Sequence, residues 1–428
     1  MDTYKYTNKS GKSMSIKMKF ALIPLTVSLL LSGCNKEEAA TVSAPAETVT
    51  TAAVEQVSAE AIKKSAYDIA DRSAKWQLAQ LGNLHYIPES HREKSEDAKF
   101  WIQASFYIGL TKWTETTDNK EFLAFIDNVA KSQNYELLQA RPYHADDHTI
   151  AQTYLWLTEQ TGNKDAYKPT QKMFDMILAN QPTVGLEMID TVADPDNKHT
   201  GKAHLEGNCQ TRWCWADALY MAPRAWLKMS NVTGDPKYFE YGDKEFWAAA
   251  DYLFSDDYGL FFRDSRYFEK KNKNGKPVFW GRGNGWVFAA LPLIIDDLPE
   301  GHPSKPRYIE LYKKNAAGLM KLQRDNGYWP PSLMDPEIVK TPEISGTAFI
   351  TYGLAWGVNN GILTDEKSKN IVEKGWAAIE KAVEPSGRVN WVQHVGKSPD
   401  PVKETDSQLY GVGAVLLAAS EMIKWSDK

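Results

Sequence analysis

The segment from Trp213 to Pro223, with the sequence WCWADALYMAP, places one carboxylic acid, Asp217, among aromatic and apolar side chains. Removing a carboxylate from water favours its protonated form, so this environment is expected to raise the pKa of Asp217 and to make it a proton donor near neutral pH. The structural alternative is an aspartate that caps a helix or pairs with a buried arginine, because ion pairs also perturb pKa values. The segment therefore predicts either a general acid or a structural ion pair.

The segment from Arg141 to His148, RPYHADDH, gathers titratable side chains just before an apolar helical stretch. Adjacent aspartates raise each other's pKa unless a helix N-terminus or a ligand stabilises them. We expect one of Asp146 and Asp147 to cap the helix, with Asp147 as a candidate, and the other to be free for catalysis; these residues do not decide which aspartate is the catalytic acid. A metal held by His144, His148 and the two aspartates is the alternative, but a loop carries His144 and the spacing does not support it. No metal or cofactor is predicted.

The glycine-rich segment FWGRGNGW, residues 279–286, sets Arg282 between Trp280 and Trp286. Glycine lets the backbone approach a ligand, and a guanidinium matches a carboxylate with two parallel hydrogen bonds. We expect a clamp for an anionic sugar, with pairing of Arg282 to a structural acid as the alternative. The glycine spacing, with no strand before it, does not match a dinucleotide site. The segment EISGT, residues 343–347, is a weaker candidate whose expected role is helix capping.

Composition and charge narrow the classes of function. The 43% hydrophobic and 25% charged residues are typical of a globular protein, and the net charge of -5 provides no polycationic surface for nucleic acid. The 15 tryptophans and 20 tyrosines suit the packing of a core and also stacking on sugar faces. Cys209 and Cys214 are predicted to form either a local disulfide or two packed thiols.

The N-terminus is typical of an export signal. Several lysines precede the apolar run Phe20–Leu31, which is too short to span a bilayer. The tetrapeptide LSGC resembles a bacterial lipobox, which implies cleavage before Cys34 and lipidation of its thiol; an ordinary secretory signal is the alternative. Asn35 favours the outer membrane of the cell envelope. We therefore divide the chain into a lipoprotein signal peptide (1–33), a flexible tether (34–58) and a catalytic domain (59–428), anchored to the membrane only through lipid.

From residue 59 onward the hydrophobic periodicity is helical, and the helices form an imperfect repeat of hairpins. The corners near Thr117, Thr161 and Thr233 each combine glycine, asparagine or aspartate with a following aromatic residue. Such a repeat predicts either an open solenoid or a closed ring of six inner and six outer helices, and the long loops favour the closed, all-α ring. The predicted helices are 59–81, 95–116, 120–133, 145–162, 165–181, 212–229, 236–255, 282–296, 306–323, 342–361, 366–382 and 405–425.

These motifs, in this order, resemble glycoside hydrolase family 105, the unsaturated rhamnogalacturonyl hydrolases, which is related to the unsaturated glucuronyl hydrolases of family 88. The resemblance covers roughly residues 60–425 and is carried by WADALYMA around Asp217, WGRGNGW around Arg282, the Asp146 loop, the 343–347 segment and the closing YGVGA at 410–414. It implies an (α/α)6 barrel, in agreement with the helix count.

The resemblance also implies an unusual hydrolysis. Polysaccharide lyases leave a C4–C5 double bond on the terminal uronic acid, and enzymes of this kind hydrate that bond. By resemblance Asp217 protonates C4 and then helps to activate water for C5, Asp146 is the second acid, and Arg282 lies near the uronate. Walls of the pocket are expected from Trp215, Trp280 and Trp286, with Asp147 and His148 beside the second acid.

One departure concerns the segment FFRDSR, residues 261–266, where some family members carry a histidine. The additional Arg263 suggests a different anion or linkage, such as a sulfated or glucuronate-containing disaccharide, and fragments of pectin rhamnogalacturonan and of algal ulvan-type polysaccharides both stay open as substrates. Two other classes of function stay open. One is an inverting glycosidase acting on saturated glycans, and the other is a non-catalytic glycan-binding surface lipoprotein.

Overall fold

The computed structural model describes residues 2–7, 13–18, 58–188 and 208–426. The predicted apolar run of the signal peptide, the lipidation site Cys34 and residues 35–57 of the predicted tether lie outside these residues. Within the described part of the chain, no helix combines the length and the apolar character needed to cross a membrane.

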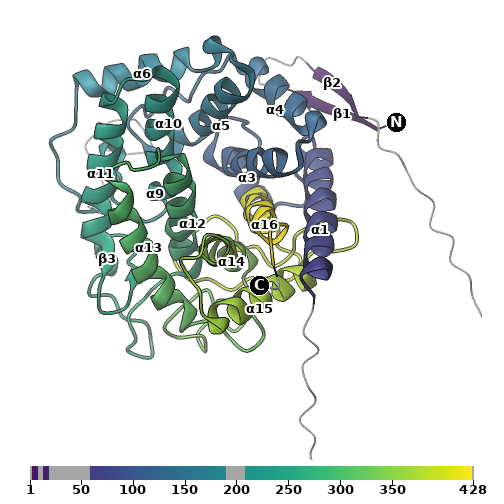
Figure 1. Cartoon of the computed structure of the whole chain (residues 1–428), viewed down its shortest axis with the longest axis vertical. Helices are drawn as coiled ribbons and strands as arrows, with labels where there is room; N and C mark the ends of the chain where they lie inside the picture. Colours follow the sequence, from purple (N-terminus) through teal and green to yellow (C-terminus); the bar gives the residue numbers. More distant parts are fainter. Residues whose placement is uncertain (1, 8–12, 19–57, 189–207, 427–428) are drawn as a thin grey trace, which may run out of the picture.

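Six inner helical segments form a closed ring (Figure 1). Each packs against the next along the chain, and the last packs against the first, which excludes an open solenoid. Helices of this ring are buried on all sides because a second layer surrounds them; every residue of α16 is buried. The segments are α3 (Trp101–Thr117), α5 (Ala145–Thr161), α9 (Ala218–Met221) with α10 (Pro223–Thr233), α12 (Gly281–Asp297), α14 (Ile344–Asn359) and α16 (Leu409–Met422).

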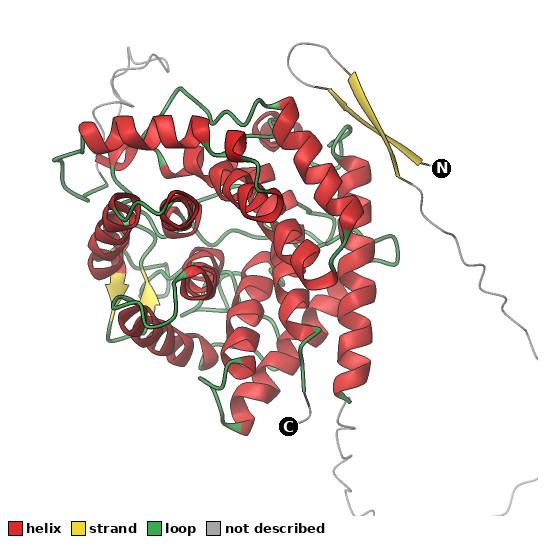
Figure 2. Ribbon diagram, turned by 45° about the horizontal axis from the view of Figure 1, so that its top comes forward, coloured by secondary structure: helices red, strands yellow, loops and turns green. Residues whose placement is uncertain are grey.

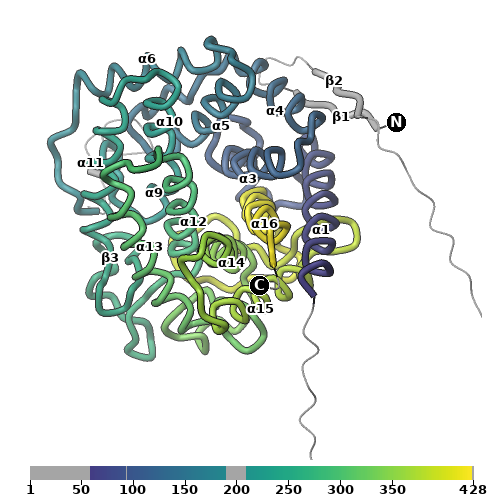
Figure 3. The backbone as a smooth tube through the Cα atoms, in the orientation of Figure 1, coloured from purple at the N-terminus to yellow at the C-terminus, as the bar shows by residue number. Residues whose placement is uncertain are grey.

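Outer helices cover this ring and bury one face each. In α15, for example, Val372, Trp376 and Ile379 are buried while lysines face outward. The first outer helix, α1, packs against the last inner helix, α16, so that the two ends of the domain lie side by side (Figure 3). The predicted (α/α)6 barrel is confirmed. The outer helices are α1 (Ala59–Gln80), α4 (Lys120–Ser132), α6 (Lys168–Ala179), α11 (Lys237–Leu253), α13 (Lys305–Met320) and α15 (Glu366–Ala382).

The hairpin corners have the expected chemistry. Asp118, Gly162 and Gly234 end their helices in the left-handed region, with φ of 50°, 70° and 74°. Asn119 and Asn163 then begin the next helical segments by accepting backbone N–H groups with their side chains. These local signals explain why most helix ends agree with the sequence prediction to within a few residues.

The helix predicted over 212–229 is wrong. The structure has a short helix α8 (Asn208–Thr211), a loop, the single turn α9, and α10 beginning at Pro223. Pro223 lacks the N–H that a continuous helix would use, which favours the break between α9 and α10. A disulfide between Cys209 and Cys214 closes the loop before α9, which settles the choice between a disulfide and two thiols.

The remaining elements are short (Figure 2). β3 (Phe254–Ser255) and β4 (Leu260–Phe261) form a small antiparallel pair, and the N-terminal β1 (Asp2–Thr7) and β2 (Ser13–Met18) form another, which the sequence did not predict. Single helical turns occur at α2 (Glu89–Arg92), η1 (Glu93–Ser95), η2 (Lys164–Ala166) and η3 (Ser265–Tyr267).

Candidate active site

The first turns of the inner helices meet at one mouth of the barrel. Trp101, the first residue of α3, stacks on Tyr410 in the first turn of α16, with ring centroids 5.5 Å apart. The guanidinium of Arg282, in the first turn of α12, lies 5.0 Å from the centre of the same Tyr410 ring. Helix N-termini carry partial positive charge, so this mouth favours an anionic ligand.

Asp217 lies at this mouth and makes no helix-cap hydrogen bond. Burial raises its pKa, while the positive charges of Arg263 and Arg282 lower it by smaller amounts. The side chain of Asp217 keeps 15% exposure, and its Oδ2 lies 3.9 Å from Nε of Arg263, which is too far for a hydrogen bond. Oδ2 has no hydrogen-bond partner among the described residues. The geometry therefore favours a proton donor over a structural ion pair.

Asp146 is the second acid of the site. It lies in the first turn of α5, and burial raises its pKa to about 7, with further increases from the charges of Asp147 and Asp217. Nη2 of Arg141 lies 3.9 Å from its carboxylate and opposes this shift. Two acids with raised pKa values, close enough to influence each other, are candidates for proton exchange with a ligand.

Asp147 has a different role from its neighbour. Its side chain is buried and accepts a hydrogen bond of 2.6 Å from Nη2 of Arg141. The expectation that one of the two aspartates caps α5 is wrong, because the cap is His144, whose Nδ1 accepts the backbone N–H of Asp146. A cap must precede the helix, and both aspartates already belong to its first turn. Burial still raises the pKa of Asp147 to about 6.

The structure does not bring His148 to the mouth. Its Nε2 lies 2.7 Å from the carbonyl oxygen of Pro142, and its Nδ1 lies 3.3 Å from the indole Nε1 of Trp226. These contacts fit an Nε2–H tautomer that donates to Pro142 and accepts from Trp226. Burial lowers the pKa of His148 to about 4, so the ring is a neutral core residue at physiological pH. Among the described residues, no group of three or more His, Cys, Asp and Glu side chains is placed to hold a metal ion.

Arg282 is buried and held by backbone carbonyls, not by a structural acid. Its Nη1 donates to the oxygen of Gln393 at 2.5 Å and its Nη2 to the oxygen of His394 at 3.0 Å. The guanidinium also lies 4.5 Å from the ring of Trp280, so aromatic rings cover it on two sides. Both Nη atoms already donate hydrogen bonds to the protein. We therefore expect Arg282 to contribute positive charge at the mouth and not two parallel hydrogen bonds to a carboxylate.

The glycines around Arg282 serve packing between helices. A Cβ at Gly281 would lie 2.6 Å from the oxygen of Pro330, and one at Gly285 would lie 3.2 Å from Cα of Gly346 in α14. The expectation that these glycines admit a ligand is wrong, because protein atoms fill the space. Glu343 caps α14 by accepting the N–H groups of Ser345 and Gly346, as expected.

The three predicted tryptophans occupy different depths. Trp215 packs against the ring of His144, with centroids 4.8 Å apart, close to both acids. Trp280 is buried and donates its indole N–H to Oε1 of Gln393. Trp286 is fully buried beneath the mouth, with centroids 4.7 Å from Tyr220 and 4.3 Å from Phe349, so it supports the site from below.

Sequence reasoning missed two aromatic residues of the mouth, Trp101 and Tyr410. Tyr410 belonged to a quoted motif, YGVGA, but was given no role, and nothing in the local sequence of Trp101 distinguishes it from a core residue. Both residues lie in the first turn of an inner helix, and this position is the signal that could have assigned them to the mouth.

Arg263 reaches the mouth from the loop after β4. Its backbone oxygen accepts the N–H of Ala216, which places it beside Asp217. Its Nη1 donates to Oδ2 of Asp264, a fully buried carboxylate that Arg266 also binds. The two arginines lower the pKa of Asp264 despite its burial. One buried carboxylate thus binds both arginines.

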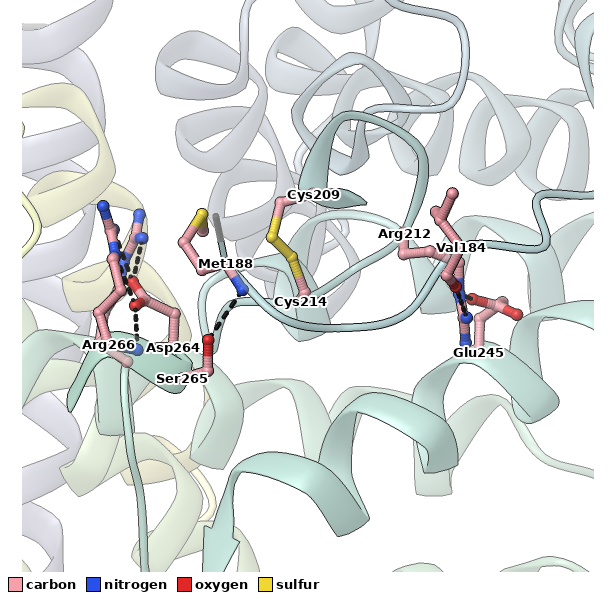
Figure 4. The surroundings of a disulfide bond; sticks show 10 residues. Val184, Met188, Cys209, Arg212, Cys214, Glu245, Asp264, Ser265 and Arg266 are labelled. Atoms are coloured by element: carbon pink, nitrogen blue, oxygen red, sulfur yellow. Dashed lines mark hydrogen bonds and ion pairs between the residues drawn. A yellow bond between two sulfur atoms is a disulfide. The ribbon is translucent and has the colours of Figure 1, made fainter. Parts of the chain in front are cut away.

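The disulfide Cys209–Cys214 lies close to this arginine loop (Figure 4). The N–H of Met188 donates to Oγ of Ser265, between Asp264 and Arg266. On the other side of the disulfide, Arg212 forms an ion pair with the buried Glu245. The disulfide and the ion pair of Arg212 with Glu245 therefore hold the segment that leads to Trp215 and Asp217.

Comparison with known proteins identifies the family of this chain. Residues 69–426 match the family model described as Glycosyl Hydrolase Family 88. The chain is 66% identical over 419 residues to the unsaturated 3S-rhamnoglycuronyl hydrolase of Alteromonas sp. (strain LOR), across 96% of this chain and 99% of that one. It is 34% identical over 335 residues to the enzyme of the same name from Formosa agariphila, across 76% and 85% of the two chains.

A solved structure supports the same assignment. The glycosyl hydrolase family 88 protein from Bacteroides vulgatus superposes with a TM-score of 0.69 at 25% identity, covering 86% of this chain and 99% of that one. The family match extends over most of the described residues, including both acids and Arg282. The chain therefore belongs to glycosyl hydrolase family 88.

Proposed function

We propose that this protein removes the 4,5-unsaturated uronic acid from the non-reducing end of lyase-generated oligosaccharides by hydrating the C4–C5 double bond. The observation that carries this proposal is the state of Asp217. Its pKa is raised by burial, its Oδ2 has no hydrogen-bond partner among the described residues, and a second acid lies nearby. Protonation of a carbon atom needs a neutral acid whose proton no protein group already holds.

The reaction begins with transfer of the Asp217 proton to C4. The electron pair of the double bond forms the new C–H bond, and positive charge develops at C5 and the ring oxygen. Water then adds to C5 and gives its proton to the Asp217 carboxylate, which regenerates the acid. The resulting hemiketal opens and releases the neighbouring sugar. In this proposal Asp146 holds the substrate hydroxyl groups or the water.

The names of the two curated relatives guide the choice of substrate. Both are called unsaturated 3S-rhamnoglycuronyl hydrolases. We propose that the released sugar is a 3-sulfated rhamnose, as in ulvan-type fragments, and that Arg263 contributes to recognition of its charge. Arg263 lies beside Asp217 at the mouth, and a guanidinium there can bind a sulfate through charge-assisted hydrogen bonds.

One assay tests the activity and separates it from two other functions. Oligosaccharides made by lyases from ulvan and from pectin are incubated with the enzyme, and the ultraviolet absorbance of the double bond is followed. We expect the absorbance to decay with the wild type and not with Asp217→Asn. Release of sugar with the absorbance retained would indicate an inverting glycosidase instead. Binding without any turnover would indicate a glycan-binding protein.

We further propose that the protein is a lipoprotein anchored through Cys34 to the bacterial cell envelope, on the basis of the LSGC motif after an apolar run. Radioactive palmitate added to expressing bacteria should label the wild type and not Cys34→Ser. The same substitution should move the protein from the membrane fraction to the soluble fraction. Equal labelling of both proteins would contradict the anchor.

A further inference from the structure

We propose that Gln393 is a positioning residue that fixes both Arg282 and Trp280 at the mouth of the barrel. Gln393 lies in the loop between α15 and α16, far from both residues in the sequence, and it is 3% exposed. Neither its position nor its neighbours in the sequence mark it as part of the site. The inference rests on the proposed function for its kinetic consequences but not for its geometry.

The side-chain amide of Gln393 is oriented by one hydrogen bond at each end. Oε1 accepts the indole N–H of Trp280 at 2.9 Å, and Nε2 donates to the carbonyl oxygen of Ser398 at 2.8 Å. An indole can only donate and a carbonyl can only accept, so a primary amide satisfies both where a carboxylate cannot. Nε2 also lies 3.5 Å from a carboxylate oxygen of Asp400, where a second carboxylate would be repelled.

The backbone of Gln393 connects three inner helices. Its carbonyl oxygen accepts from Nη1 of Arg282 in α12 and from the hydroxyl of Tyr410 in α16, each at 2.5 Å. Its N–H donates to Oε1 of Glu343, the cap of α14, at 3.2 Å. A shift of this peptide would therefore move groups at the beginnings of α12, α14 and α16 together.

Arg282 depends on this peptide because both of its Nη atoms donate to carbonyl oxygens of the same loop, those of Gln393 and His394. Its Nε has no hydrogen-bond partner among the described residues. Within the described part of the chain no carboxylate forms an ion pair with the guanidinium, so the loop sets the distance between this positive charge and Asp217. Trp280, whose ring covers the guanidinium, is fixed by the same glutamine.

The test compares Gln393→Met, which keeps the shape of the side chain and removes both hydrogen bonds, with Arg282→Gln and with the double variant. We expect Gln393→Met to lower kcat/KM at least about tenfold, in line with the loss of two buried hydrogen bonds. The double variant should lose no more than Arg282→Gln alone, because both changes remove the same positioned charge. If the fold losses in kcat/KM of the two single variants multiply in the double variant, the proposal is wrong.

The pH dependence of activity provides a second test, because a purely structural role of Gln393 would not shift it. Beside burial, the charges of Arg263 and Arg282 and a backbone hydrogen bond lower the pKa of Asp217, the charge of Asp264 raises it, and Asp146 is close enough to interact with it. Loss of the Arg282 charge raises this pKa, so the alkaline limb of the profile should move to higher pH in Gln393→Met, as in Arg282→Gln. An unmoved limb in a folded variant would contradict the proposal.

The matched control is Gln103→Met. Gln103 is also a buried glutamine whose Nε2 donates to a carbonyl, that of Ser95, and whose Oε1 accepts from an aromatic side chain, that of Tyr107. It should lose a similar amount of thermal stability while its pH profile stays that of the wild type. Should Gln393→Met fail to fold, Trp280→Phe deletes the same hydrogen bond from the other side, and it should shift the alkaline limb in the same direction.

A crystal structure of Gln393→Met separates this inference from the proposed function. We expect the Arg282 guanidinium to leave the carbonyl oxygens of residues 393 and 394. If it stays in place, the inference is wrong whatever the enzyme turns over. If the wild type fails to turn over any unsaturated oligosaccharide, the proposed function is wrong, and the position of Arg282 in the variant still decides the inference.

Discussion

Oδ2 of Asp217 lies 3.9 Å from Nε of Arg263, close enough for an electrostatic effect and too far for a hydrogen bond. This oxygen of the proposed proton donor is therefore under the influence of a positive charge without being hydrogen-bonded to it. Nη1 of Arg263 donates a hydrogen bond to Oδ2 of Asp264 and not to Asp217. This separation lets burial keep the pKa of Asp217 raised while the arginine moderates the shift.

Replacing Arg263 by methionine should raise the pKa of Asp217, because the largest opposing charge is lost. A general acid works in its protonated form, so the alkaline limb of the kcat profile should move to higher pH. Arg266→Met is the control, since Arg266 binds the same Asp264 and is not among the groups that shift Asp217. Equal shifts in both variants would show that Asp264, and not the arginine, governs Asp217.

Asp146→Asn should stabilise the protein at about pH 8 and leave its stability unchanged near pH 3. Burial raises the folded-state pKa of Asp146 from 3.8 to about 7, so its contribution to stability is present at low pH and is lost as pH rises through about 7. The neutral amide avoids that loss, and we expect a gain of about 1–3 kcal/mol at the higher pH. Urea unfolding at both pH values measures it, while activity should fall. No difference in stability between wild type and variant at pH 8 would contradict the assigned shift.

Sequence reasoning anticipated the barrel because its signals are local. Glycine or aspartate at left-handed corners, asparagine caps and a helical hydrophobic period each act within a few residues, and they recur along the chain. The broken helix before Pro223 was missed because the apolar pattern runs through the break, although the proline itself was a visible signal.

The candidate site was anticipated in its residue types and less well in its contacts. The acids and Arg282 lie together at the mouth, but the partners of Arg282 are more than a hundred residues away in the sequence. His148 was misplaced because four residues of helix after His144 carry its ring into the core, against Phe174 and Trp226. Only tertiary packing decides such contacts.

Arg141→Met should destabilise the protein strongly at neutral and higher pH and weakly at about pH 4. The substitution leaves Asp147 buried without its partner, and breaking a buried pair in this way costs about 3–5 kcal/mol. Acid reduces the cost because Asp147, whose pKa is about 6 with the arginine present, becomes protonated and needs no positive partner. Urea unfolding across this pH range gives the measurement.

The control for this prediction is Arg307→Met, which breaks an ion pair with Asp251 that is more than half exposed. Exposed pairs contribute at most about 1 kcal/mol, so this variant should change stability little at any pH. A loss for Arg141→Met that does not depend on pH would assign the effect to packing of the arginine stem and not to the charge of Asp147.

Removing the disulfide with Cys209→Ser and Cys214→Ser together should lower both stability and turnover. Closing a loop of this length stabilises the folded state by about 2 kcal/mol through the entropy of the unfolded chain. Because Cys214 lies next to Trp215 and three residues before Asp217, greater freedom of this loop should lower kcat more than it raises KM. Thermal unfolding and kinetics with and without dithiothreitol measure both effects. Reduction of the wild type should reproduce the double variant, and a reduced enzyme with unchanged kcat would show that the ion pair of Arg212 with Glu245 is enough to hold the acid in place.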